Sequence, residues 1–188
     1  MDAKILKYED VRHQIKNGDI LLFKGTNLGS WFVQKVTRSH YSHAGIAAWW
    51  NERLMVMEAR GKGVNANPFS VSVAHSHGPV EWFTCAKDIS DRDRLRMIVF
   101  AQEELGKSYG RLKTIALGLK TLFSRDLDKR DRLRREGKLF CSEYVARAYN
   151  FIGLDLKKQR SDRFMRPRDI AESPLLERRG RLRLSTKS

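Results

Sequence analysis

The stretch Lys138-Leu139-Phe140-Cys141-Ser142-Glu143-Tyr144-Val145-Ala146 decides the fold that we expect for this chain. Apolar side chains recur at positions 141, 145, 148, 149 and 152, the spacing of one buried helix face, and a glycine at 153 suits the end of that helix. A thiol in a first helical turn lies near unpaired N–H groups and the positive end of the helix dipole, and both favour the nucleophilic thiolate. Because free cysteine is also among the most buried residue types, a purely structural role for Cys141 stays open at this point.

The length of 188 residues suits one domain with a sizeable core, which we place at 1–176, followed by a basic tail at 177–188. The N-terminus lacks the long apolar core of a signal peptide, and no run of eighteen apolar residues predicts a membrane span. Cys85 and Cys141 are too few for a disulfide framework. We therefore expect reduced thiols and a cytoplasmic location, with peripheral membrane contact as an option.

The net charge of +15 attracts anionic membrane, nucleic acid or other acidic partners and says nothing about the fold. Residues 124–138 hold seven Lys or Arg against four acids, and the tail adds four arginines between 178 and 183. A solvated surface run explains such segments equally well. The preceding stretch, 111–123, predicts a helix with lysines beside an apolar stripe, which suits either core packing or a membrane surface.

The order of predicted elements is one helix, several strands and then more helices, which indicates an α+β domain with an antiparallel sheet packed against helices. We expect a first helix over 4–16, a strong strand at 19–23, and a short helix or packed loop at 28–37. A short strand at 70–73 and another at 80–86 follow. Ser90 then begins a helix whose apolar face carries Leu95, Ile98 and Val99.

Two β-compatible runs flank Asn51-Glu52 and predict a hairpin. If these two residues form the turn, paired numbers sum to 103, so position 45 faces Glu58 across the hairpin. Because side chains alternate between the two faces of a sheet, His43 and Glu58 then project from the same face as diagonal neighbours. Gly45 leaves the space opposite Glu58 open.

A cysteine nucleophile needs a base to take its proton, and the base needs a third group to hold its ring. Histidine is the usual base because its pKa lies near neutrality. His43 begins an apolar strand, where a polar side chain has little structural purpose, and Glu58 shares its face. Taken singly, each of the two also suits an ordinary polar residue at a strand end, and nothing in this spacing brings Cys141 close to them.

The segments GDILLF, SHYSHAGIAAWW, VMEARGKGV, ELGKSYG, LFCSEYVARAY and MRPRDIA together resemble the permuted branch of the NlpC-type papain-like cysteine hydrolases, from about Asn17 to Glu172. The chain order His43, Glu58, Cys141 is that of the permuted branch, which includes YiiX-like and lecithin:retinol acyltransferase-like proteins. The resemblance implies a circularly permuted papain-like fold. It also implies Cys141 as nucleophile, His43 as general base and acid, and Glu58 as the orienting group.

The resemblance further implies that Tyr41 and Tyr109 shape the substrate site, whereas Gly110 and the insert at 124–138 depart from the family pattern. We expect no cofactor. His75 and His77 lie two apart, as metal ligands on a strand do, but no further ligands accompany them, and we interpret them as loop histidines.

The function that we favour is that of an amidase or peptidase that forms a thioester intermediate on a peptide or acyl-amide substrate. An acyl-lipid esterase or acyltransferase is the alternative within the same chemistry. A non-catalytic basic module that binds anionic membrane or nucleic acid is the alternative from another class.

Overall fold

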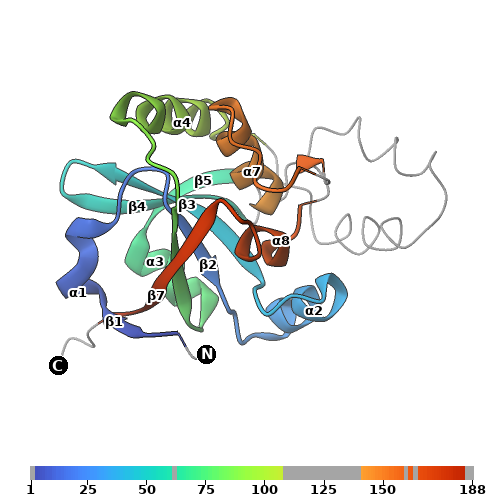
Figure 1. The fold of residues 1–188 in the computed structure, drawn as a ribbon. Helices are drawn as coiled ribbons and strands as arrows, with labels where there is room; N and C mark the ends of the chain where they lie inside the picture. Colours follow the sequence, from blue (N-terminus) through green and yellow to red (C-terminus); the bar gives the residue numbers. More distant parts are fainter. Residues whose placement is uncertain (1–2, 61–62, 108–140, 159–160, 163–164, 185–188) are drawn as a thin grey trace.

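The computed structural model describes residues 3–60, 63–107, 141–158, 161–162 and 165–184. Within them, seven strands form one sheet in the order β1-β7-β6-β2-β3-β4-β5 (Figure 1). The strands are β1 (Ile5–Lys7), β2 (Ile20–Phe23), β3 (His43–Trp50), β4 (Arg53–Arg60), β5 (Gly63–Pro68), β6 (Val80–Cys85) and β7 (Leu176–Arg183). Neighbouring strands run antiparallel except β1 and β7, which are parallel. The α+β class is confirmed, with one parallel pairing added to the expected antiparallel sheet.

Helices cover both faces of this sheet. They are α1 (Tyr8–Val11), α2 (Leu28–Thr37), α3 (Phe69–Ser76), α4 (Asp91–Glu103), α7 (Cys141–Phe151) and α8 (Pro167–Ala171), with a 3₁₀ turn at Arg12–Gln14. Figure 1 shows α4 and α7 together along one side of the sheet and α3 on the other. The helix expected to begin at Cys141 is therefore present and packs on β3 and β4.

The apolar strand β2 lies in the middle of the sheet and divides the core in two. Ile20 and Leu22 pack into the cluster beneath α4 and α7, and Leu21 and Phe23 pack into the cluster on the α3 side. All four side chains are fully buried. A strand buried on both faces has a continuous apolar run, which is why this element is evident in the sequence.

The β3–β4 hairpin has the predicted register, because Trp50 pairs with Arg53 and Ile46 pairs with Met57. Asn51 adopts a left-handed conformation with a φ of 53°, as an asparagine in a tight turn does. The hairpin therefore places position 43 and position 58 on one face, as the alternation predicts.

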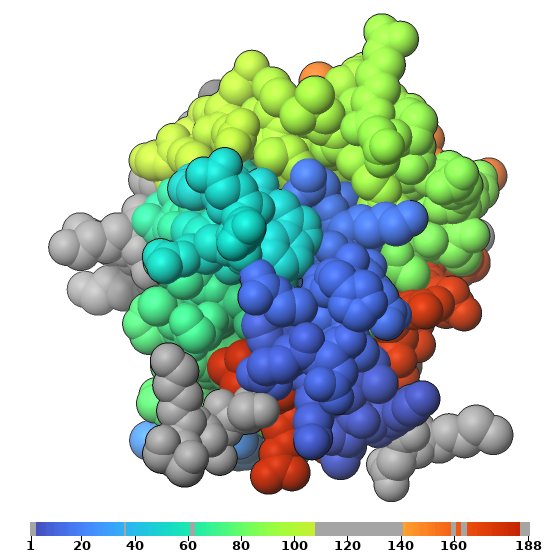
Figure 2. Space-filling model, turned by 90° about the vertical axis from the view of Figure 1, so that its left-hand side faces the viewer, coloured from blue at the N-terminus to red at the C-terminus, as the bar shows by residue number. Residues whose placement is uncertain are grey.

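The helix expected over 4–16 is wrong. Residues 5–7 instead form the edge strand β1, which pairs with β7, and only α1 and the 3₁₀ turn are helical. The long-range pairing outweighs the local helical pattern. Figure 2 shows this N-terminal segment against the tip of the β3–β4 hairpin, where an Arg12 Nη2–H donates to the Glu52 carbonyl at 2.5 Å.

The strand expected at 70–73 is also wrong, because these residues lie within α3. Phe69 and Ser72 of this helix are buried against the sheet, and that packing outweighs the β-propensity of two valines. The face predicted for α4 is confirmed at Ile98, which is buried, and wrong at Leu95 and Val99, which are 61% and 44% exposed. Arg94 and Met97 are buried in their place. An Arg94 Nη1–H donates to the Asn17 carbonyl at 2.7 Å, which ties this helix to the turn before β2.

The tail expected at 177–188 is wrong up to residue 183. Residues 176–183 form β7, in which Leu182 pairs with Val80 of β6 and with Leu6 of β1. A run of arginines suggests a solvated segment. In a strand, however, every second side chain points to the other face, so Leu182 is buried although its arginine neighbours are not. Tyr109, the helix expected at 111–123 and the basic segment 124–138 lie outside the described residues.

Candidate active site

The first residue of β3 and the sixth residue of β4 meet on the α3 side of the sheet. His43 Nε2 lies 2.5 Å from Glu58 Oε2, and the Glu58 side chain is fully buried. His43 is 8% exposed, and its ring centroid lies 5.5 Å from that of Phe23 on β2. The imidazole is thus held from one side by a carboxylate and from another by an aromatic ring.

Glycine at 45 is a requirement of this arrangement. A Cβ built at Gly45 would lie 2.5 Å from Val56 Cγ1 and 3.4 Å from the Glu58 Cβ. A side chain at this position would force the neighbouring strand away. The space left by Gly45 lets the diagonal pair of His43 and Glu58 approach each other.

Glu58 is anchored by further groups on β5, α3 and its own strand. Its Oε1 accepts hydrogen bonds from Ser72 Oγ at 2.8 Å and Asn67 Nδ2 at 3.1 Å, and Arg60 Nε lies 3.4 Å from Oε2. Burial alone would raise the pKa of Glu58, but the hydrogen bond and charge of His43, together with the charge of Arg60, outweigh it and lower the pKa to about 2. The carboxylate is therefore ionised at neutral pH.

Cys141 is the first residue of α7 and is 7% exposed. Burial alone would raise its thiol pKa. The charge and hydrogen bond of His43 and the backbone N–H groups of Ala44 and Ser142 outweigh burial and lower it. A thiolate there is consistent with a cysteine at a helix N-terminus.

The pKa of His43 moves in the opposite direction. Burial alone would lower it, but the charge and hydrogen bond of Cys141, followed by those of Glu58, outweigh burial and raise it. A lowered thiol pKa beside a raised imidazole pKa favours a thiolate–imidazolium pair. Because Nε2 faces Glu58, the other ring nitrogen, Nδ1, remains for the thiol.

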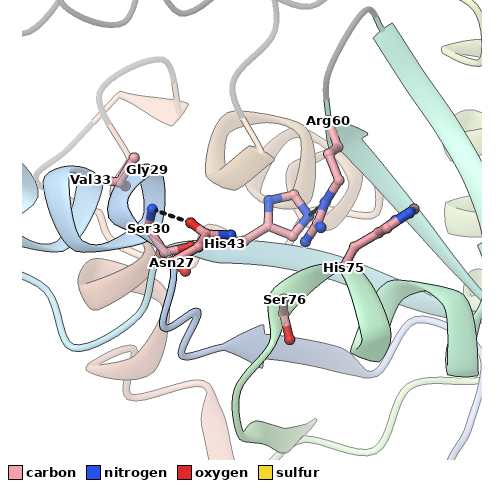
Figure 3. A pocket seen from close by; sticks show the side chains of 9 residues that line it. Asn27, Gly29, Ser30, Val33, His43, Arg60, His75 and Ser76 are labelled. Atoms are coloured by element: carbon pink, nitrogen blue, oxygen red, sulfur yellow. Dashed lines mark hydrogen bonds between the residues drawn. The ribbon is translucent and has the colours of Figure 1, made fainter.

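A pocket of about 190 Å³ opens beside His43, between the first turn of α2 and the end of α3. Most of its lining residues have polar side chains and none of them is a carboxylate; they are Asn27, Gly29, Ser30, Val33, Ser42, His43, Arg60, His75 and Ser76. In Figure 3 the Arg60 side chain lies beside the His43 ring. The pocket therefore reaches the Cys141–His43–Glu58 cluster through His43.

The structure brings Cys141, His43 and Glu58 together and places Tyr41 differently. The Tyr41 hydroxyl donates to Glu81 Oε2 at 2.6 Å, and its side chain packs in the core rather than along the pocket. A role for Tyr41 in substrate binding stays a prediction, as does one for Tyr109, which lies outside the described residues.

Sequence reasoning missed three residues that support the site, namely Arg60, Asn67 and Ser72. Arg60 lies two residues after Glu58 on β4, so the alternation of side chains along a strand places both on the same face. The contact of Asn67 with Glu58 depends on the β4–β5 register, in which Asn67 pairs with Val56. The contact of Ser72 with Glu58 depends on the packing of α3 against the sheet. The sequence had no signal for these last two contacts.

Two further expectations concern metals and membranes. His75 lies in the last turn of α3 rather than in the expected loop, and His77 is the C-cap residue with a left-handed φ of 51°, so neither lies on a strand. The described part of the chain holds no group of three or more His, Cys, Asp or Glu that suits a metal ion. Among the helices that the structure describes, none has the length and apolar character to cross a membrane.

Comparison with known families identifies the class. Residues 14–114, more than half of the chain, match the permuted papain-like amidase family YaeF/YiiX, also called C92. The chain belongs to this family and is an enzyme, a cysteine hydrolase of the papain-like amidase type. The match includes His43 and Glu58 and ends before Cys141.

A solved structure shares the fold. The chain is similar to the crystal structure of the metalloprotein YiiX from Escherichia coli O157:H7, with a TM-score of 0.65 and 22% sequence identity over 88% of this chain and 96% of that one. The circularly permuted papain-like fold is thereby confirmed. No curated protein matches the sequence.

Proposed function

We propose that this enzyme hydrolyses an amide bond through a thioester on Cys141, with His43 as general base and acid and Glu58 as the orienting group. The observation that supports it most is the hydrogen-bonded series from the Cys141 thiol through His43 to the buried Glu58 carboxylate. This series joins a nucleophile, a base and an orienting carboxylate. Peptides and acyl amides are the substrate classes that we favour.

The Cys141 thiolate attacks the carbonyl carbon, and the carbonyl oxygen takes up the negative charge. The Cys141 backbone N–H stabilises this oxyanion, because an N–H in the first turn of a helix has no acceptor within the helix. The imidazolium of His43 then donates its proton to the leaving amine as the C–N bond breaks, which leaves the thioester.

Water completes the cycle. Neutral His43 takes a proton from a water molecule, whose oxygen attacks the thioester carbon. The C–S bond breaks, the carboxylic acid product leaves, and the thiolate and imidazolium are restored. Throughout, Glu58 stays ionised and keeps the imidazole in one orientation, as its lowered pKa requires.

Thiol reactivity and acyl trapping test this proposal without a known substrate. We expect iodoacetamide at pH 6 to label Cys141 faster than Cys85, and His43→Ala to abolish the difference. With a p-nitrophenyl ester as probe, we expect a burst of p-nitrophenol and a mass increase on Cys141 that hydroxylamine removes. Cys141→Ala should show neither, whereas Cys85→Ala should keep both; a burst that persists in Cys141→Ala excludes Cys141 as nucleophile.

A panel of peptide, acyl-amide and acyl-ester substrates then identifies the bond that is cleaved. Cleavage of amides that depends on Cys141 supports the amidase assignment. Turnover confined to acyl esters would replace it with the esterase alternative, while the same nucleophile is retained.

A further inference from the structure

Helix α2 carries large apolar side chains that the described part of the chain leaves exposed. Leu28 is 87% exposed, Trp31 55% and Phe32 44%. Residues three and four apart lie on one side of a helix, so these three form a single apolar ridge. Core packing does not explain why these three residues are apolar, because the described core clusters include none of them.

Basic side chains accompany this ridge on the same helix. Lys35 lies in the last turn of α2 and Arg38 is its C-cap residue, both are exposed, and no acidic residue occurs between Asp19 and Glu52 in the sequence. Lys35 Nζ lies 5.9 Å from the centre of the Trp31 ring, so a cation sits directly beside the apolar side chains. An exposed apolar ridge of Leu, Trp and Phe flanked by Lys and Arg is the pattern of a helix that lies in a membrane interface.

The helix that carries the ridge also forms one wall of the active-site pocket. Its N-cap residue Asn27 and, in its first turn, Gly29 and Ser30 line the pocket beside His43, and Val33 of the same helix joins them. The ridge residues Leu28, Trp31 and Phe32 are interleaved with these wall residues and do not line the pocket themselves. At 100° per residue, the ridge therefore lies on the side of α2 opposite the pocket wall, and a surface that binds the ridge lies one helix width from the pocket.

We propose that α2 docks this enzyme onto anionic lipid membranes, with Leu28, Trp31 and Phe32 inserted among the lipids and Lys35 and Arg38 facing the anionic headgroups. The docked enzyme would act on a substrate held at that surface, a consequence that rests on the proposed function. We favour a lipid membrane over a groove on another protein as the partner, because one short helix combines exposed apolar side chains with basic ones.

Vesicle co-sedimentation with the full chain tests the docking. We expect binding to vesicles of equimolar phosphatidylglycerol and phosphatidylcholine, and much weaker binding to phosphatidylcholine alone. High salt should weaken it, because exposed charges are screened beyond about 8 Å at physiological ionic strength. The double variant Leu28→Ser/Phe32→Ser should lose about tenfold or more in vesicle affinity, since two apolar side chains no longer enter the lipid. Lys35→Gln should lose less, and only on anionic vesicles.

A matched control separates docking from general stickiness. Leu95 and Val99 are also four residues apart on a helix and are 61% and 44% exposed, so Leu95→Ser/Val99→Ser removes a similar apolar surface from α4. We expect this variant to bind vesicles like the wild type. Equal affinity of wild type and Leu28→Ser/Phe32→Ser would overturn the proposal, as would equal losses in both double variants.

The catalytic readout is kept independent of the docking. Leu28→Ser/Phe32→Ser should keep the wild-type burst with a water-soluble p-nitrophenyl ester, and Cys141→Ala should keep wild-type vesicle binding. Burst activity without vesicle binding in the wild type refutes the docking alone, whereas vesicle binding without any burst refutes the proposed function alone. Loss of self-association in the Leu28→Ser/Phe32→Ser variant, with no effect on vesicles, would assign the ridge to a second copy of the chain and overturn the proposal.

Discussion

His43 and Glu58 are fifteen residues apart in sequence, yet His43 Nε2 and Glu58 Oε2 lie 2.5 Å apart at the end of one hairpin. The contact is diagonal across two paired strands and uses the space left by Gly45. Its consequence is electrostatic, because a carboxylate with a pKa of about 2 faces an imidazole whose pKa is raised. Cys141 joins this pair from a helix more than eighty residues further along the chain.

The pKa of His43 should fall when Cys141 is replaced by alanine. The charge and hydrogen bond of Cys141 are the largest influences that raise this pKa, and burial opposes them. Without Cys141, burial lowers the pKa of His43 against the opposing effect of Glu58 alone. Titration of the His43 ring protons by NMR measures the shift. Cys85→Ala should leave the His43 pKa as in the wild type, and an unchanged value in Cys141→Ala would mean that the thiol and imidazole are not coupled.

Glu58→Gln should reduce kcat by about 10²-fold, which is less than the loss in Cys141→Ala. The substitution removes the charge that stabilises the imidazolium, and acid–base catalysis by histidine contributes about 10²–10⁴-fold in total. Ser72→Ala removes one hydrogen bond to Glu58 and keeps its charge, so we expect a smaller loss. Steady-state kinetics on the substrate found by the panel compares the three. If Ser72→Ala is as damaging as Glu58→Gln, the position of the carboxylate matters more than its charge.

Glu58 should make the fold sensitive to acid. Its folded-state pKa of about 2 lies below its ordinary value of 4.5, so the folded protein binds this proton more weakly than the unfolded chain does. The resulting stabilisation is fully present above pH 4.5 and is lost as the pH falls toward 2. Denaturant unfolding across this range should give a steeper loss for the wild type than for Glu58→Gln. Parallel curves would show that Glu58 does not contribute to the pH dependence.

Leu182→Ala should destabilise the protein by about 2–5 kcal/mol, the usual cost of truncating a buried leucine. Leu182 is 6% exposed and lies between β6 and β1, where it belongs to the core on the α3 side. Arg183→Ala, at the next and exposed position, serves as the control. Urea unfolding of both variants distinguishes a core strand from a solvated tail, for which neither substitution would matter.

The sequence by itself determined the elements whose patterns are local. The β3–β4 register follows from a two-residue turn and strand alternation, and it predicts that His43 and Glu58 share a face. The strand β2 and the helix that begins at Cys141 are evident because each is a short, strongly apolar unit with a recognisable end. The sequence therefore identifies Cys141, His43 and Glu58 as candidate catalytic residues. No local pattern in it places Cys141 close to the other two.

Only the tertiary structure decided the features that depend on distant partners. Residues 5–7 become a strand because β7 offers them a parallel edge, and residues 70–73 become helical because α3 packs Phe69 and Ser72 against the sheet. The same holds within the site, where Asn67 and Ser72 reach Glu58 and the α7 N-terminus brings Cys141 to His43. Local propensities differ by less than about 1 kcal/mol per residue, so burial and pairing between distant segments override them.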